Sequence, residues 1–221
     1  MPIKHLVLDL DLTCVKAVSK DDIDNGNISS HIVKKMELIN MTDILGEKIG
    51  TGSVLSLYVY KRPYLKEFIE FAIDYFETIS IWSAGKYKYV HNVKELIFDD
   101  YPKPMIILTH DDLLVNGNYN AVKDLNKIYS RIKGANETNT IIIDDNSETF
   151  KKNQNNGILI PQFCSPENPR DSDFQKNDIN LLQLIKFFQL ENVKNCEDVR
   201  KLNKCCIFTT SIERYNELLK N

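Results

Sequence analysis

A short apolar segment that ends in two aspartates constrains this chain most. Residues 6 to 8 are typical of a buried strand, and Asp9, Asp11 and Thr13 follow at its end. In an open α/β sheet, ligands bind at the carboxyl ends of the strands. Two neighbouring carboxylates are costly unless a cation or a shared proton compensates them. The segment therefore predicts a chemical site at a sheet edge, with an acidic turn as the alternative interpretation.

The rest of the chain alternates between strand and helix patterns. Strands are predicted over residues 54–60, 78–82, 105–108, 140–143 and 157–160, and helices over 65–76, 89–97, 122–132, 180–190 and 193–202. This alternation is typical of an α/β fold with a doubly wound, mainly parallel sheet. We expect one domain over residues 1–202.

Two segments fall outside this pattern. Residues 16–53 are polar and weakly periodic, which predicts a variable loop insertion. Residues 203–221 carry a short helical pattern and are expected to form a C-terminal appendage. The interval between Asp9 and Ser83 is too short for a large cap domain, so we expect an open cleft.

Net charge, hydrophobicity and cysteine content indicate which partners and which cellular compartment to expect. The net charge is −3, and no apolar run approaches 18 residues, which argues against nucleic-acid and membrane partners. The N-terminus lacks a signal-peptide pattern. Five cysteines, an odd number without C-x-x-C pairing, fit a reducing compartment. We expect an intracellular protein, either nuclear or cytoplasmic.

Acidic side chains recur at the predicted sheet edge. Asp144 and Asp145 follow the strand at 140–143, and Ser83 follows the strand at 78–82. Right-handed crossovers place these strand ends at one edge with Asp9 and Asp11. At about 4 Å, each pair of like charges costs roughly 4 kcal/mol at an effective dielectric of 20.

This repulsion calls for positive charge. An all-oxygen ligand set points to Mg²⁺. Lys123, expected to open a helix between these strands, would add a second positive charge.

The order of these residues carries a resemblance to a known family. Asp-x-Asp-x-Thr, then Ser83, then Lys123, then Asp144-Asp145 resembles the haloacid dehalogenase (HAD) superfamily of aspartyl-phosphate phosphatases. The segment Lys61-Arg62-Pro63 and the region 117–125 resemble a narrower branch: the NLI-interacting-factor-like phosphatases that act on the C-terminal domain (CTD) of RNA polymerase II. The similarity spans roughly residues 3 to 200.

The resemblance implies a Mg²⁺-dependent phosphatase of phosphoserine or phosphothreonine in proteins. Asp9 would be the nucleophile that forms an aspartyl phosphate. Asp11 would be the general acid and then the general base. The hydroxyl of Thr13 would hold Asp11.

The remaining site residues have implied roles in binding phosphate and metal. Ser83, with the amides of Ala84 and Gly85 at a helix start, would bind the phosphoryl group, and Lys123 would neutralise it. Asp145 is the better candidate for a direct Mg²⁺ ligand, and Asp144 would either bind the ion or support its ligands. Asp9 would also contribute to the metal site, and the resemblance makes the backbone carbonyl of Asp11 a ligand.

Departures from the family leave alternatives open. Residues 109–114 lack an arginine that helps the small polymerase phosphatases to bind substrate phosphate, so polymerase-tail specificity is in doubt. Substrates could instead be small molecules or nucleic-acid ends, or the chain could be a catalytically silent adaptor. Arg62, Lys86 and Lys88 could guide a phosphopeptide, or be ordinary solvated surface.

A cysteine-dependent mechanism is a further alternative. Cys164 and Arg170 match the spacing C-x₅-R, but Pro166 and Pro169 lack the N–H groups that such a phosphate cradle needs. A surface loop is the simpler interpretation.

Overall fold

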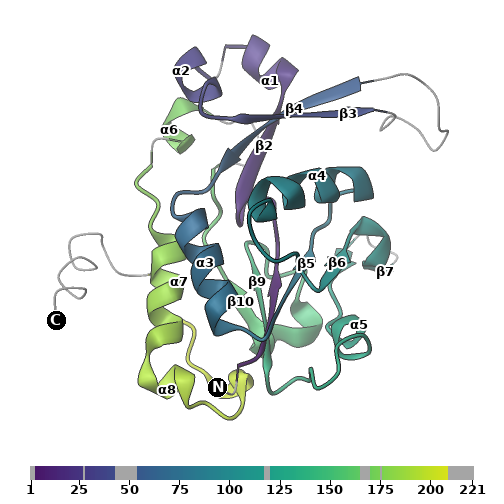
Figure 1. Ribbon diagram of the computed structural model, residues 1–221, viewed down its shortest axis with the longest axis vertical. Coiled ribbons are helices and arrows are strands. Elements are labelled where there is room, and N and C mark those ends of the chain that lie inside the picture. The colour runs from purple at the N-terminus through teal and green to yellow at the C-terminus, as the bar shows by residue number, and fades with distance from the viewer. Residues whose placement is uncertain are drawn as a thin grey trace.

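The computed structural model describes residues 3–26, 28–42, 54–116, 120–164, 170–174 and 176–208. Its centre is a five-stranded sheet in which all neighbouring strands pair in parallel, with strand order β10-β9-β1-β5-β6 (Figure 1). The strands are β1 (His5–Leu8), β5 (Thr78–Trp82), β6 (Ile106–Leu108), β9 (Thr140–Asp144) and β10 (Gly157–Leu159). The predicted α/β fold with a mainly parallel sheet is confirmed.

Strand β1 lies in the middle of this sheet. Leu8 is in register with Ile81 of β5 and with Ile143 of β9. The three strands therefore end side by side, and the residues that follow them meet at one edge.

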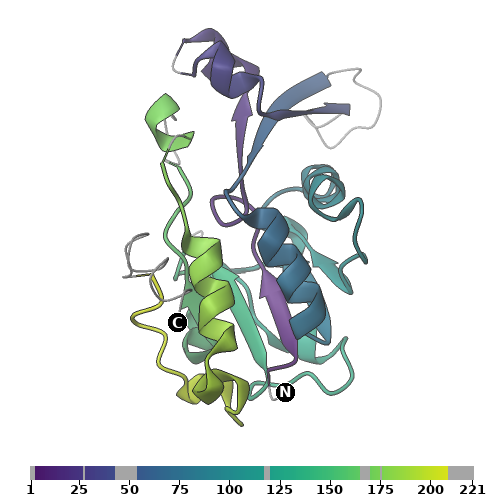
Figure 2. The ribbon, with the colours of Figure 1, turned by 60° about the vertical axis from the view of Figure 1, so that its left-hand side comes forward.

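Helices cover both faces of the sheet. Leu6 and Leu8 belong to a core with α3 (Leu65–Tyr75), α4 (Tyr87–Phe98) and α7 (Asn180–Gln189). Figure 2 shows α3 and α7 side by side on one face. Val7 lies in a second core with Ile128 of α5 (Asn126–Tyr129). Successive residues of a strand point to opposite faces, so a strand buried on both sides reads as a continuous apolar run.

A second, three-stranded antiparallel sheet stands above the carboxyl ends of the parallel strands (Figures 1 and 2). It has the order β2-β4-β3, and its strands are β2 (Val15–Ser19), β3 (Glu37–Thr42) and β4 (Val54–Lys61). A separate core of Val18, Ile32, Phe163 and Phe174 joins it to α2 (Ser30–Val33) and α6 (Asp171–Phe174).

The prediction of a loop over residues 16–53 is therefore wrong for residues 16–26 and 28–42, while residues 43–53 lie outside the described residues. Ser19 ends β2 and caps α1 (Lys20–Asp24), because its hydroxyl accepts from the Asp22 amide and the Asp22 carboxylate accepts from the Ser19 amide. The predicted strand at 54–60 exists, but it belongs to this antiparallel sheet. The pairing that orders these strands joins residues far apart in sequence, such as Val18 and Tyr58.

Two predicted helices differ from the structure. The segment 122–132 begins with a strand, β8 (Asn120–Val122), which pairs with β7 (Leu114–Asn116), and only α5 is helical. Lys123 thus follows a strand instead of opening a helix. The predicted helix at 193–202 is divided into α8 (Glu191–Lys194) and the 3₁₀ turn η3 (Val199–Lys201).

The other short elements are the 3₁₀ turns η1 (His110–Asp112) and η2 (Lys151–Asn156). Of the expected appendage, residues 205–208 form a turn, and residues 209–221 lie outside the described residues. Residues 117–119, which begin the region 117–125 that carries the family resemblance, also lie outside them. A domain boundary at residue 202 stays a prediction.

Candidate active site

The centre of the site is a buried ion-pair cluster at the edge of the parallel sheet. Lys123 Nζ donates to Asp9 Oδ1 and to Asp144 Oδ2, each at 2.6 Å. Lys123 and Asp144 are each 1% exposed, and Asp9 is 5% exposed. Asp9 is fixed relative to β9 because its amide donates to the carbonyl of Ile143. Strands β1 and β9 and the end of β8 thus bring together three residues that are up to 135 positions apart in sequence.

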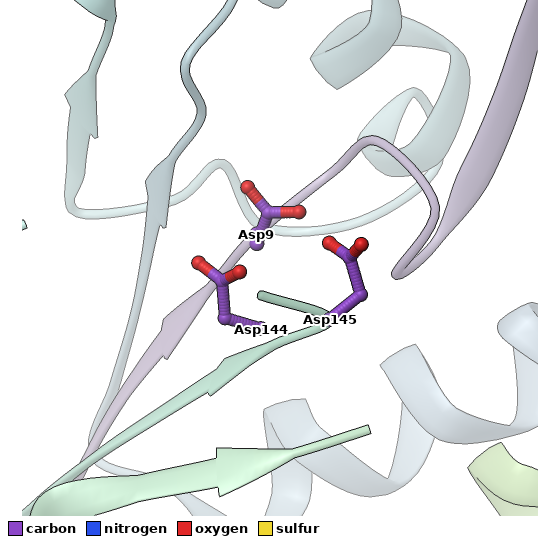
Figure 3. Close-up of side chains that lie close together, drawn as sticks. All are labelled: Asp9, Asp144 and Asp145. Atoms are coloured by element: carbon purple, nitrogen blue, oxygen red, sulfur yellow. The ribbon is translucent and has the colours of Figure 1, made fainter. Parts of the chain in front are cut away.

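A third carboxylate completes an acidic group. Asp9, Asp144 and Asp145 each offer an oxygen, and these oxygens all lie within 4.8 Å of one another (Figure 3). Burial, followed by the repulsion of Asp144 and Asp11, raises the pKa of Asp9 well above its usual range despite the nearby ammonium. Burial and the charge of Asp144 also raise the pKa of Asp145.

The donor set fits a hard divalent cation. Three carboxylates face one ammonium group, so the cluster has an excess of negative charge when ionised. Oxygen-only ligands of this kind suit Mg²⁺, which is commonly held by one or two carboxylates together with water and substrate phosphate.

Hydroxyl and amide groups donate hydrogen bonds that orient Asp144 and Asp145. Thr149 Oγ1 donates to Asp144 Oδ2 at 2.7 Å, and the Thr149 carbonyl accepts from the Lys123 amide at 2.6 Å. Asp145 accepts from Gln162 Nε2 at 2.9 Å and from Thr13 Oγ1 at 3.4 Å. Thr13 was expected to hold Asp11; the structure places its hydroxyl against Asp145 instead.

Asp11 lies in a different environment from Asp9. It accepts hydrogen bonds from Ser83 Oγ at 3.2 Å and from the Tyr89 hydroxyl. Burial raises the pKa of Asp11, and the hydrogen bonds from Tyr89 and Ser83 partly oppose this shift. Leu12 has a left-handed backbone (φ 58°), which turns the chain between Asp11 and Thr13. Asp11 does not belong to the group formed by Asp9, Asp144 and Asp145, although its charge still raises the pKa of Asp9.

Gly85 lies between Ser83 and Tyr89. Its amide donates to Ser83 Oγ at 3.0 Å, and a Cβ at this position would lie 2.6 Å from the Tyr89 ring. Only glycine leaves room for Tyr89 to reach Asp11. Ala84 is exposed, and α4 begins at Tyr87, so both residues precede the helix start as the sequence predicted.

Comparison with known proteins identifies the family. The sequence model of the NLI interacting factor-like phosphatases matches residues 4–200. The chain belongs to this family. The expected HAD-type, CTD-phosphatase-like resemblance is thereby confirmed.

Curated proteins that are similar to this chain support the family assignment. The chain is 30% identical over 196 residues to "CTD small phosphatase-like protein 2" of Dictyostelium discoideum, a match that covers 88% of this chain and 28% of the relative. It is 25% identical over 206 residues to "Nuclear envelope morphology protein 1" of Saccharomyces cerevisiae, covering 90% of this chain and 41% of the relative. The chain thus spans less than half the length of these two relatives.

Solved structures show the same fold. A fission yeast RNA polymerase II CTD phosphatase, an Fcp1 variant bound to beryllium fluoride, matches with a TM-score of 0.58 at 21% identity, covering 99% of this chain and 56% of that one. A second Fcp1 structure matches with a TM-score of 0.57 at 16% identity, covering 99% and 62%. Among the described residues, no helix has the length and apolar character needed to cross a bilayer.

Tyr89 is the site residue that the sequence interpretation missed. It was assigned only to the apolar face of a helix. A buried tyrosine hydroxyl usually needs a hydrogen-bond partner, and this signal could have pointed to a nearby acid.

Arg62 has a role that neither sequence interpretation anticipated. It is 1% exposed, so it is neither solvated surface nor available to guide a peptide. Its guanidinium donates to the carbonyls of Thr13 and Pro161 at 2.9 and 2.7 Å and pairs with Asp178 at 2.8 Å. Five N–H donors in a rigid fork suit such a junction, and Arg62 thereby ties the loop after β1 to two distant segments.

Lys86 and Lys88, in contrast, are exposed at the start of α4. Lys86 lies 3.7 Å from the Asp111 carboxylate.

The cysteine-dependent alternative loses support. Cys164 is buried, and burial raises the pKa of its thiol to about 12. A nucleophilic cysteine needs the opposite shift, because the thiolate is the reactive form. Residues 165–169 of the proposed motif lie outside the described residues.

Proposed function

We propose that this chain is a Mg²⁺-dependent protein phosphatase that hydrolyses phosphoserine or phosphothreonine through an aspartyl phosphate on Asp9. One observation carries the proposal: a single buried ammonium, Lys123, joins Asp9 and Asp144 next to a third carboxylate, Asp145. Membership of a phosphatase family supports it.

The side chains divide the reaction between them. Lys123 holds Asp9 Oδ1, so the other oxygen of Asp9 attacks phosphorus. Asp11 gives a proton to the leaving alkoxide and later takes one from the attacking water. Ser83 and Lys123 bind the phosphoryl oxygens as charge moves onto them. A bound Mg²⁺, held by Asp9, Asp144, Asp145 and the Asp11 carbonyl, would supply the remaining charge neutralisation.

A protein substrate is the best-supported class. The relatives and similar structures include proteins named for acting on the polymerase CTD. Segment 109–114 lacks arginine and carries the exposed Asp111, so we do not extend the proposal to the polymerase tail itself. A nuclear or cytoplasmic location remains part of the proposal.

Trapping the covalent intermediate tests the mechanism. In Asp11→Asn, p-nitrophenyl phosphate should still phosphorylate the enzyme because its leaving group needs no acid, whereas hydrolysis should stall. We expect a burst of nitrophenol and a hydroxylamine-labile phosphate on the peptide that contains Asp9. Asp9→Asn should give neither, with turnover falling on the order of 10⁶-fold as for other covalent nucleophiles.

Cys164→Ser is the control for this experiment, and it should turn over like the wild type. Activity lost in Cys164→Ser and kept in Asp9→Asn would refute the assignment. A catalytically silent adaptor would show no burst in any variant.

A substrate panel tests the protein-substrate claim. Phosphopeptides should be preferred over sugar phosphates, nucleotides and oligonucleotides with 3′-phosphate ends. Equal or better turnover of any of these other classes would remove the claim and leave the chemistry of Asp9 intact.

A further inference from the structure

Two neighbouring cysteines lie together on the surface, and neither belongs to the candidate active site. Cys205 and Cys206 are exposed, and their sulfur atoms are 3.4 Å apart. Nothing in the proposed phosphatase reaction uses them. Adjacent exposed thiols differ from a lone cysteine because one reagent can bond to both sulfurs at once.

The pair is held in position from both sides. Asn203 Oδ1 accepts from the Cys205 amide at 3.1 Å and from Cys205 Sγ at 2.8 Å. Lys204 Nζ donates to the carbonyls of Asn155 and Val199, each at 2.7 Å, and Ile207 is buried in the main core. The two thiols are therefore presented by an anchored turn, which lowers the entropic cost of binding them together.

The spacing favours a bridging atom over a disulfide. Consecutive Cα atoms are about 3.8 Å apart, shorter than the roughly 4.4–6.8 Å that disulfides adopt. Closing a bond of about 2.05 Å between these sulfurs would strain the turn. Two bonds of about 2.3 Å from a soft centre to sulfur, in contrast, span the observed separation at an angle near 95°.

A cavity adjoins the pair. It has a volume of about 520 Å³, and Phe150, Leu159, Cys205 and Phe208 are among its lining residues. An apolar group attached to the bridging atom would have aromatic and aliphatic contacts there.

We propose that Cys205 and Cys206 form a two-thiol site for a soft thiophilic centre, trivalent arsenic being the class it takes, with an aryl substituent in the adjoining cavity. With a hydrated arylarsine oxide, each thiol gives its proton to an arsenic-bound oxygen. Two As–S bonds form, two As–O bonds break and two water molecules leave. Arsenic stays trivalent, so no oxidant is required.

Phenylarsine oxide is the probe for this site. The full chain is treated with it, alkylated with iodoacetamide and digested with trypsin, which releases both cysteines in one peptide, residues 205–214. We expect one phenylarsenic per chain, both thiols of this peptide protected and Cys196 alkylated. A dithiol should reverse the adduct, whereas a monothiol at the same concentration should not.

Variants separate a paired site from ordinary thiol labelling. Cys205→Ser and Cys206→Ser should each raise the half-protection concentration by at least about tenfold, because the second point of attachment is lost. Cys196→Ser is the matched control and should leave it unchanged. Single variants that bind like wild type, or a peptide that loses two hydrogens without gaining arsenic, would overturn the proposal.

Arsenite tests the cavity. It lacks the aryl group, so it should protect less well than phenylarsine oxide. Equal protection would show that the substituent does not occupy the cavity.

Discussion

The two catalytic aspartates of the proposed mechanism lie two residues apart, yet their surroundings differ in kind. Asp9 is paired with a buried ammonium and lies among two further carboxylates. Asp11 has hydrogen bonds from two hydroxyl groups, those of Ser83 and Tyr89. Leu12, which follows directly, has a left-handed backbone, and the next residue, Thr13, donates a hydrogen bond to Asp145.

This contrast explains how one short segment can hold two different reagents. A nucleophile must be ionised when it attacks. Burial and the nearby carboxylates raise the pKa of Asp9, and the ammonium of Lys123 is the neighbour that opposes this shift. A general acid must keep a proton, and burial favours that form of Asp11, although the hydrogen bonds from Tyr89 and Ser83 partly oppose it. The difference between the two carboxylates is therefore that Asp9 is paired with an ammonium group, whereas Asp11 is hydrogen-bonded to hydroxyl groups.

Removal of the Lys123 ammonium group should have the largest effect on stability and turnover. Lys123→Met leaves Asp9 and Asp144 buried without their cation, so we expect the free energy of unfolding to fall by about 3–5 kcal/mol and turnover to be lost. Chemical denaturation with and without Mg²⁺ measures the stability term.

Lys94→Met is the matched control. Lys94 is also buried, but among the described residues its ion pair is with the half-exposed Glu95. It should cost about 1 kcal/mol or less from loss of the ion pair. If the free energy of unfolding falls by the same amount in both variants, the ion pairs of Lys123 contribute no more to stability than the ion pair of Lys94.

Metal binding should depend on the acidic group formed by Asp9, Asp144 and Asp145. We expect EDTA to abolish turnover and Mg²⁺ to raise the melting temperature by mass action. Asp145→Asn should weaken that thermal shift, raising the Mg²⁺ concentration for half effect by about tenfold or more.

Asp111→Asn serves as its control because Asp111 is exposed and does not belong to the acidic group. Turnover that persists after chelation would remove Asp145 from its proposed role.

Changes to the hydroxyl groups that contact Asp11 should lower kcat less, and by an amount that depends on the substrate. Tyr89→Phe removes one hydrogen bond to Asp11, which we expect to lower kcat for a phosphoserine peptide by about tenfold, since one such bond is worth roughly 0.5–1.5 kcal/mol. Turnover of p-nitrophenyl phosphate should change less, because its leaving group needs little help from an acid.

Tyr87→Phe alters an exposed neighbour on the same helix and should leave both substrates unaffected. An equal loss on both substrates in Tyr89→Phe would indicate a packing role and not a role in positioning the acid.

Much of this architecture could be read from local pattern. The continuous apolar runs at 6–8 and 140–143 predicted buried parallel strands, and the acids at their ends followed from position alone. Segment 16–53 could not be read in this way. Its strands are ordered by β4 and by a small core that includes Phe163 and Phe174, and these contacts are distant in sequence.

Arg62 shows the same limit for a single residue. An arginine after a strand is usually solvated, and only the convergence of Thr13, Pro161 and Asp178 gives it enough partners to be buried.

By itself, the sequence determined the parallel α/β fold and the set of acidic and basic groups at the strand ends, because strand periodicity and residue order are local properties. The tertiary structure alone decided which carboxylate faces the lysine and which faces the hydroxyls. Those pairings depend on the turn at Leu12, on the space left by Gly85 and on side chains from separate strands meeting at one edge. Electrostatic environment is set by distance in space, and the order of residues along the chain does not specify it.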